Sequence, residues 1–316
     1  MDAKEPSRMD KLTGKGRAAI ELIADDATFK ENFIDGIFVC ADIAPGAVVG
    51  TGCINGQPAT IISIDAMAPS GRFPVIYAGI IGLEEGYKMA MAVYDTIKLG
   101  AVAEASPAPG SVINSPGGGN AETFRKRPIV LIVDTPGNGP GKTEEIFGMN
   151  KSTGAYQLAL AEARQHGHPV VAVVIGRAIS GAFLCHGLQA DRILALSKDF
   201  GTIIHVMPLS SIARITKLDI ETLEELSKSN PVFASGADYF YKLGGIDEII
   251  EGIDDIKPAV VRHIEEIHAL HNEKASGSAG PWHRGRLGEI RGGRTARAQV
   301  LKKMAEEFEL VKDLYN

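Results

Sequence analysis

The sequence predicts an α/β protein, and two observations favour this class. The uniformly apolar runs 128–133 and 170–175 have the composition of strands that are buried on both faces. A helical pattern at 150–165 separates them, and such alternation is typical of a sheet covered by helices. The chain of 316 residues is long for one domain but common for an α/β fold with added helices.

A β-hairpin is expected before the parallel part of the sheet. The β-rich runs 47–54 and 57–65 are joined by Asn55-Gly56, the pair that most readily adopts the positive φ angles of a type I′ turn. These two runs are therefore expected to form antiparallel strands. Residues 1–36 precede them and predict an N-terminal helical arm.

The remaining elements follow from the spacing of apolar residues. Further helices are expected at 15–33, 83–99, 181–189, 223–227, 237–243, 256–270 and 301–311, and further strands at 193–196 and 202–206. The last helix carries an apolar stripe at spacings of three, four and three, which favours ordinary core packing over a seam for a partner.

One segment departs from this regular alternation. Residues 100–124 are dense in Ala, Pro, Ser and Gly. A loop of this length is uncommon in a compact domain. The sequence leaves two interpretations open, a flap that orders on a partner or substrate and a flexible surface insertion.

Composition excludes several classes of protein. A net charge of −6 and a pI of about 5.8 lack the basic character of a nucleic-acid binder. No apolar run reaches the length of a membrane span, and the N-terminus has no apolar signal region. The three cysteines are far apart, and neither they nor the eight histidines have metal-ligand spacing. We expect a cytoplasmic protein without a metal site.

Two strand-to-helix turns fall where α/β sheets bind ligands, beyond the carboxyl ends of the strands. The first, 134–143, is similar to a phosphate-binding loop, but Pro136 stands where that motif needs glycine. The second, 176–183, follows a strand expected to end at Ile175 and leads into a helix whose first N–H groups have no partner within the helix. The second turn predicts an anion or oxyanion site. A glycine placed there only for tight packing is the alternative.

Several short motifs follow one another along the chain. They are Gly50-x-Gly52-x-Ile54-Asn55-Gly56, Asp134-Thr135-Pro136-Gly137, Glu144-Glu145, Ser180-Gly181-Ala182, Ala190-Asp191 and Gly244-Gly245-Ile246-Asp247. Together they resemble the acyl-CoA carboxyltransferase family of the crotonase superfamily. Within that family, the insertion, the Arg-rich tail and His205-Val206-Met207-Pro208 look most like the gamma subunit of biotin-independent malonate decarboxylase.

The resemblance implies a fold and a site. The fold is a crotonase-like ββα superhelix over 37–273 with additional N- and C-terminal helices, followed at 274–316 by a basic loop and a C-terminal helix. The implied catalytic residues are Gly181 and Ala182, whose backbone N–H groups form an oxyanion hole, with Ser180 beside them. The implied substrate-binding residues are Asp134, Thr135, Pro136, Gly137, Gly176 and Arg177.

The resemblance also implies a reaction and partners. With a homologous beta subunit, the chain is expected to decarboxylate malonyl-S-acyl carrier protein to the acetyl form and CO2 through a thioester enolate. The phosphopantetheine-type arm comes from the acyl carrier protein, and an acyl carrier protein transferase subunit is a further partner. No cofactor is expected to be bound covalently, since Lys88 lacks the Met-Lys-Met context of biotin attachment. The basic tail from Arg284 to Arg297 is a candidate contact for the acidic carrier protein or its phosphates.

Two alternatives and two questions stay open. The chain is alternatively the alpha-type subunit of a biotin-dependent acyl-CoA carboxyltransferase, or a non-catalytic scaffold for the beta chain. Larger residues at 177–179, where carboxyltransferase alpha chains carry a glycine-rich run, favour a site that does not receive carboxybiotin. Sequence spacing singles out no proton donor for the enolate, and it does not decide whether these amides hold the thioester oxygen or the departing carboxylate.

Overall fold

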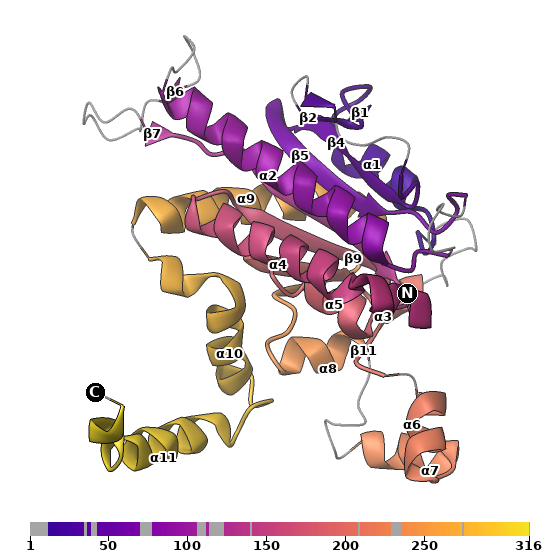
Figure 1. Cartoon of the computed structure of the whole chain (residues 1–316), viewed down its shortest axis with the longest axis vertical. Coiled ribbons are helices and arrows are strands. Elements are labelled where there is room, and N and C mark those ends of the chain that lie inside the picture. The colour runs from indigo at the N-terminus through magenta and orange to yellow at the C-terminus, as the bar shows by residue number, and fades with distance from the viewer. Residues whose placement is uncertain are drawn as a thin grey trace, which may run out of the picture.

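The computed structural model describes most of the chain. The described residues are 12–34, 37–38, 43–69, 78–105, 112–113, 123–139, 141–207, 209–228, 236–273 and 275–315. An eight-stranded mixed sheet lies at the centre, and helices cover both of its faces (Figure 1). The α/β class predicted from the sequence is confirmed.

The sheet combines an antiparallel edge with a parallel body. Its order is β1 (Lys30–Glu31), β4 (Ala47–Ile54), β5 (Gln57–Ile64), β8 (Ile129–Thr135), β9 (Val170–Ile179), β10 (Arg192–Leu196) and β12 (Glu248–Ile250). Pairs β1·β4 and β4·β5 are antiparallel, and the pairs from β5 to β12 are parallel. A further strand, β11 (Ile203–His205), pairs in parallel with the carboxyl end of β9.

The predicted hairpin is present. Strands β4 and β5 pair along their whole length, from Ala47 opposite Ile64 to Ile54 opposite Gln57. Asn55 and Gly56 between them have φ angles of 51° and 76°, as a type I′ turn requires.

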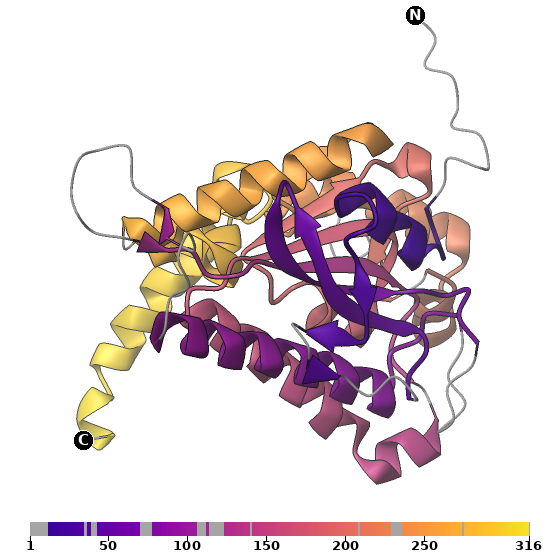
Figure 2. The same ribbon diagram turned by 90° about the horizontal axis from the view of Figure 1, so that it is seen from above.

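Two apolar layers enclose the sheet. Helices α2 (Leu83–Ala105) and α4 (Met149–Gln165) lie side by side on one face, while α1 (Gly16–Ile23) and α9 (Ile256–Asn272) cover the other (Figure 2). Strand β8 shows why the run is uniformly apolar. Its alternate residues belong to different clusters, Leu131 to the α2/α4 layer and Val130 to the α1/α9 layer, because successive side chains of a strand point to opposite faces.

Smaller elements complete the chain outside this body. They are β2 (Phe33–Ile34), β3 (Ile37–Phe38), β6 (Val112–Ile113), β7 (Thr123–Phe124), α3 (Lys142–Phe147), α5 (Ser180–Cys185), α6 (Leu209–Thr216), α7 (Ile220–Ser227), α8 (Ala237–Lys242), α10 (Gly280–Ile290) and α11 (Arg297–Glu309). The pairs α6/α7 and α10/α11 extend away from the sheet (Figure 1). Only parts of the 100–124 insertion are described. Its first residues continue α2 to Ala105, and β6 pairs with β7. The rest lies outside the described residues.

Three local expectations were wrong. The helix expected at 15–33 ends at Ile23, and short strands follow it because the chain then pairs with β4. The segment expected as a basic loop contains α10, in which glycines at 285 and 288 allow close packing; a Cβ at Gly288 would lie 2.2 Å from the carbonyl of Leu243. The stripe on α11 is not core, since that helix buries no residue.

Candidate active site

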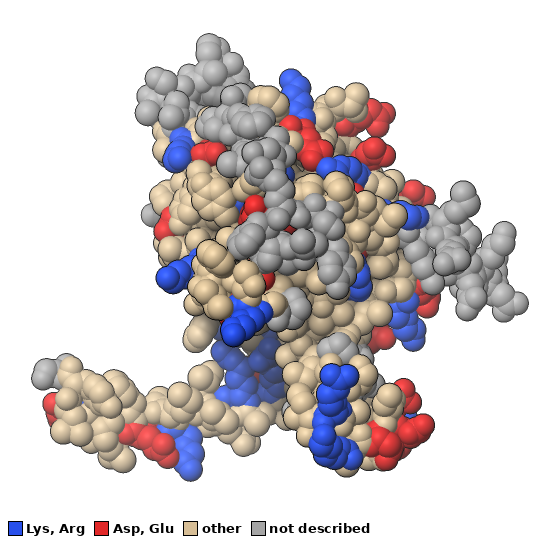
Figure 3. Space-filling view, turned by 45° about the vertical axis from the view of Figure 1, so that its right-hand side comes forward, with Lys and Arg blue, Asp and Glu red and all other residues tan. Residues whose placement is uncertain are grey.

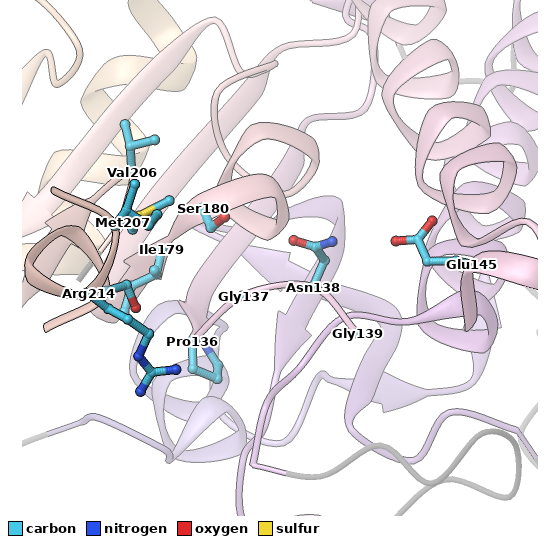
Figure 4. Close-up of a pocket in the computed structure, with 12 residues that line it drawn as sticks. Pro136, Gly137, Asn138, Gly139, Glu145, Ile179, Ser180, Val206, Met207 and Arg214 are labelled. Carbon is cyan, nitrogen blue, oxygen red and sulfur yellow. The ribbon is translucent and has the colours of Figure 1, made fainter. Parts of the chain in front are cut away.

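A pocket opens at the carboxyl ends of strands β8 and β9. Its cavity volume is about 490 Å³. The lining residues come from the loop after β8, from α3, from the β9-to-α5 junction and from the β11-to-α6 segment (Figure 4). They are Pro136, Gly137, Asn138, Gly139, Glu145, Ile179, Ser180, Val206, Met207, Ser211, Arg214 and Ile215. The two turns identified from the sequence thus meet at one cavity.

The expected end of the second strand needs correction. Strand β9 continues through Gly176 to Ile179 instead of ending at Ile175. Two partners hold the extension: β11 pairs with residues 177–179, and the backbone N–H of Arg177 donates to Asp134. Helix α5 therefore begins directly at Ser180, and it ends at Cys185 rather than near residue 189.

Asp134 and Arg177 engage each other behind the pocket. The Asp134 carboxylate is fully buried and accepts from Arg177 through the backbone N–H at 2.7 Å, Nε at 2.9 Å and Nη2 at 3.2 Å. It also accepts from the backbone N–H of Gly14. Gly176 is the residue that permits this approach, because a Cβ there would lie 2.7 Å from Asp134 Oδ1. Asp134, Gly176 and Arg177 therefore fasten the two strand ends together and do not line the cavity.

The turn after β8 is held on both sides. Thr135 is buried and its hydroxyl bonds to the backbone of Gly137, accepting at 3.3 Å and donating at 3.2 Å. On the other side, Ile81 N–H donates to the Gly137 carbonyl and Gly139 N–H donates to the Ile81 carbonyl. Gly137 has a φ of 141°, which side chains with a Cβ rarely adopt. Pro136 and Gly137 line the pocket from this fixed turn.

Helix α5 begins at the pocket with a strained residue. Ser180 has a φ of 56°, and the left-handed conformation costs a residue with a Cβ roughly 1–2 kcal/mol. Backbone strain of this kind is concentrated at functional sites. Ser180 is exposed and lines the cavity.

The amides that follow Ser180 are unpaired. Among the described residues, no acceptor bonds to the backbone N–H of Gly181 or Ala182. The Asn138 side chain lies against Gly181, since a Cβ at 181 would lie 2.8 Å from Asn138 Oδ1. The polar side chain of Asn138 therefore lies beside the backbone of Gly181.

The far end of α5 is fixed by a buried network. The Tyr156 hydroxyl lies 2.9 Å from His186 Nδ1, and His186 Nε2 lies 2.9 Å from the carbonyl of Ile132 in β8. This pairing makes Nε2 the protonated nitrogen and Nδ1 the acceptor of the tyrosine proton. Burial lowers the pKa of His186 to about 4 and raises that of the Cys185 thiol to about 12. The neutral imidazole joins α4, α5 and β8 and does not reach the pocket.

A buried carboxyl group supports the neighbouring loop. Glu144 is buried, and its Oε2 accepts from the backbone N–H of Leu83 at 3.1 Å. Burial is the largest cause that raises its pKa. Burial likewise raises the pKa of Glu85 to about 7. Of the acidic pair that the sequence singled out, Glu145 alone lines the cavity.

The structure adds residues that sequence reasoning missed. Asn138 and Gly139 lie inside the first turn, but without the fold nothing distinguished them from their neighbours. Ser211, Arg214 and Ile215 come from α6, which the sequence analysis did not predict. Their spacing of three and four residues places them on one face of that helix, and this periodicity is the signal that could have identified them.

Several arginines of the basic tail hold it against the rest of the protein. Arg284 is buried and donates to the carbonyls of Leu188 and Ala190, and Arg291 donates to that of Ile246 and stacks over the Tyr241 ring. Arg294 donates to the Leu243 carbonyl and Arg297 pairs with Glu289. Carbonyl acceptors leave the positive charge uncancelled, and Figure 3 shows Lys and Arg side chains gathered below the body of the molecule.

Neither a metal-binding cluster nor a membrane-spanning helix occurs among the described residues. No group of three or more His, Cys, Asp or Glu side chains there has a metal-binding arrangement. None of the helices in that part of the chain combines the length and the apolar character of a membrane span.

Fold and site together define a class. The sheet has parallel strands with a pocket at their carboxyl ends, an N-terminal antiparallel pair, and unpaired amides at the start of a short helix. This combination is typical of a carboxyltransferase-like enzyme subunit with a crotonase-like fold. Comparison with known proteins agrees. The sequence model of the malonate decarboxylase gamma subunit family, MdcE, matches residues 117–308.

Individual relatives are similar over nearly the whole chain. Malonyl-S-ACP:biotin-protein carboxyltransferase MADD of Malonomonas rubra is 59% identical over 301 residues, which cover 95% of this chain and 97% of the relative. A chain of the Pseudomonas malonate decarboxylase hetero-tetramer with coenzyme A superposes with a TM-score of 0.70 at 26% identity, covering 92% of this chain and 98% of its own. A chain of the Pseudomonas MdcD-MdcE hetero-dimer gives a TM-score of 0.62 at 27% identity, with coverage of 92% and 97%.

The chain belongs to the malonate decarboxylase gamma subunit family. It is therefore a subunit of a decarboxylase-type enzyme, as expected from the motifs.

Proposed function

We propose that this chain, together with a beta subunit, cleaves the carboxyl group from malonyl-S-acyl carrier protein and leaves the acetyl thioester. When the bond between the α-carbon and the carboxyl carbon breaks, its electron pair moves into the thioester carbonyl and gives an enolate. One proton then converts the enolate to the acetyl group. The difficult part is to hold the negative oxygen until that proton arrives.

The main support for the proposal is that the backbone N–H groups of Gly181 and Ala182 have no acceptor among the described residues. Fixed N–H donors stabilise charge that develops on oxygen, and removing one such donor typically costs about 2.7–4 kcal/mol of transition-state stabilisation. The rigid surroundings support this role. The Thr135 turn, the Asp134–Arg177 pair and the His186 network hold the two strand ends and α5 in place before substrate arrives.

A specific observation favours a second candidate for the fate of the carboxyl group. The Malonomonas relative, at 59% identity, is named for transfer to a biotin-protein, whereas the Pseudomonas decarboxylase chains share 26–27%. In the first candidate CO2 is released directly. In the second, the same enolate forms while the carboxyl group moves to a biotin-carrying partner. Both need the same oxyanion site.

Turnover of malonyl-S-acyl carrier protein by the co-purified complex with its beta subunit tests the proposal. Acetyl thioester and CO2 formed without any biotin protein would support direct release. Product that forms only when a biotinylated carrier is added, and that avidin prevents, would support transfer. No acetyl thioester under either condition would rule out both.

Exchange chemistry isolates the enolate step from the fate of the carboxyl group. A site that stabilises the enolate also forms it in reverse, so the complex should exchange the α-protons of acetyl-S-acyl carrier protein for deuterium in D2O. Mass spectrometry of the released acetyl group measures the exchange. A complex that turns over substrate without such exchange would argue against an enolate held at Gly181 and Ala182.

A further inference from the structure

Arg214 is the cationic group of the pocket. Of the described residues that line the cavity, only Arg214 and Glu145 carry a charge. The Arg214 guanidinium forms no ion pair or hydrogen bond within the described part of the chain. This differs from Arg177, which pairs with Asp134, and from four arginines of the tail, which bond to backbone carbonyls or to Glu289: Arg284, Arg291, Arg294 and Arg297.

The helix that carries Arg214 aims it at the strand ends. Ser211, Arg214 and Ile215 share one face of α6 and line the cavity together. In the close-up, Arg214 lies beside Ile179 and Pro136, whereas Glu145 stands on the opposite side beyond Asn138 (Figure 4). The cavity is therefore positive at one end and negative at the other.

Apolar side chains line the cavity together with the exposed Arg214. Ile179, Val206, Met207 and Ile215 line the same wall. A planar guanidinium matches a carboxylate with two parallel hydrogen bonds.

We propose that Arg214 binds the carboxylate of the malonyl group and thereby distinguishes malonyl from acetyl thioesters. This inference rests on the proposed function. It assigns the two oxygen sites that the sequence left open: the carboxylate faces Arg214, away from the repelling Glu145, and the thioester oxygen faces the amides of Gly181 and Ala182. The Arg214 pair belongs to the ground state, because the carboxylate loses its charge as the carboxyl carbon departs.

Binding of free malonate tests the assignment without requiring turnover. In calorimetric titrations of the complex with its beta subunit, we expect Arg214→Gln to weaken malonate binding at least tenfold and Arg214→Lys to restore part of it. Lys217→Gln is the matched control, since Lys217 is an exposed cation that follows the same helix and does not line the pocket. Equal malonate affinity in wild type and Arg214→Gln would overturn the assignment.

Kinetics separate the carboxylate from the rest of the substrate. For malonyl-S-acyl carrier protein, we expect Arg214→Gln to raise KM at least tenfold without lowering kcat, because the lost contact stabilises the ground state more than the transition state. Inhibition by acetyl-S-acyl carrier protein should stay unchanged. If that inhibition weakens in parallel, Arg214 holds the carrier arm and the assignment is wrong. A wild-type complex that binds malonate through Arg214 but does not turn over the thioester would reject the proposed function alone.

Discussion

Arg177 clamps Asp134 with its backbone N–H and two guanidinium nitrogens at distances of 2.7–3.2 Å. The pair joins the ends of β8 and β9 at the two turns from which the pocket is built. Asp134 is fully buried, whereas the Arg177 side chain is 24% exposed. Removing the arginine therefore leaves a buried carboxylate, whereas removing the aspartate leaves a guanidinium that water can partly reach.

Loss of the arginine should be the more damaging change. Arg177→Leu leaves a fully buried carboxylate with the backbone donors alone, and breaking a buried pair in this way typically costs about 3–5 kcal/mol. Asp134→Asn leaves a partly exposed guanidinium and a neutral amide, for a cost of about 1–3 kcal/mol. Urea unfolding measures both. Lys228→Met breaks an exposed pair and should leave the midpoint unchanged.

Combining the two changes checks that they act on one contact. The double variant Arg177→Leu/Asp134→Asn should be less destabilised than the sum of the single variants, because no buried charge is then left without its partner. Strict additivity would show that the residues do not depend on each other.

Two substitutions at Ser180 distinguish the effect of its left-handed backbone on stability from the effect of its hydroxyl on the reaction. Glycine adopts that conformation without strain, so Ser180→Gly should raise the free energy of unfolding by up to about 1 kcal/mol, while Ser180→Ala keeps the strain. If the hydroxyl bonds to the charged substrate, both variants should lose roughly 10- to 100-fold in turnover, as expected for a hydrogen bond of about 1.5–3 kcal/mol. Full activity in both would leave the Ser180 hydroxyl without a role in the reaction.

Asn138 restricts the space at Gly181. The methyl group of Gly181→Ala would lie 2.8 Å from Asn138 Oδ1, so the Asn138 side chain must shift. We expect this shift to disturb the proposed donors at Gly181 and Ala182 and to lower turnover at least tenfold (about 1.4 kcal/mol). Adding Asn138→Ala opens the space, and the double variant should match Asn138→Ala alone. Losses that multiply instead would place the effect of the methyl group elsewhere.

Buried histidines make the fold acid-sensitive. Burial lowers the pKa values of His168, His186 and His268 to about 4, whereas in the unfolded chain histidine titrates near 6.5. The unfolded state therefore binds more protons between pH 6.5 and pH 4. The stability present above pH 6.5 is lost as pH falls through this window, by an amount on the order of 3 kcal/mol for the fully buried His186.

Thermal unfolding across that window measures the effect. His168→Asn should flatten the dependence, and His166→Asn, at an exposed histidine close by in the chain, should not. Glu85 acts in the opposite direction, since its pKa of about 7 keeps it protonated in the fold where the unfolded carboxyl ionises. Glu85→Gln should thus make the acid loss steeper. A stability independent of pH between 4 and 6.5 would contradict the assignment of neutral histidines.

Local patterns were sufficient for the regular elements. Asn55-Gly56 predicted its turn because the requirement for positive φ is met within two residues. Apolar runs predicted β8, β9 and β10 because a strand buried on both faces has no polar alternation. The motifs at 134–137 and 180–182 led to the right family and to one edge of the sheet.

Long-range contacts decided the rest. Strand β9 passes Ile175 because Asp134 and β11, both distant in sequence, pair with its extension, and Asp134 turns inward to Arg177 instead of facing a ligand. Asn138 and Arg214 meet the pocket only because the loop after β8 and helix α6 converge there. Periodicity in the sequence indicates which face of a helix or strand is apolar. It does not indicate which distant residue pairs with a buried charge, or which separate loops come together, because these contacts do not depend on neighbouring residues.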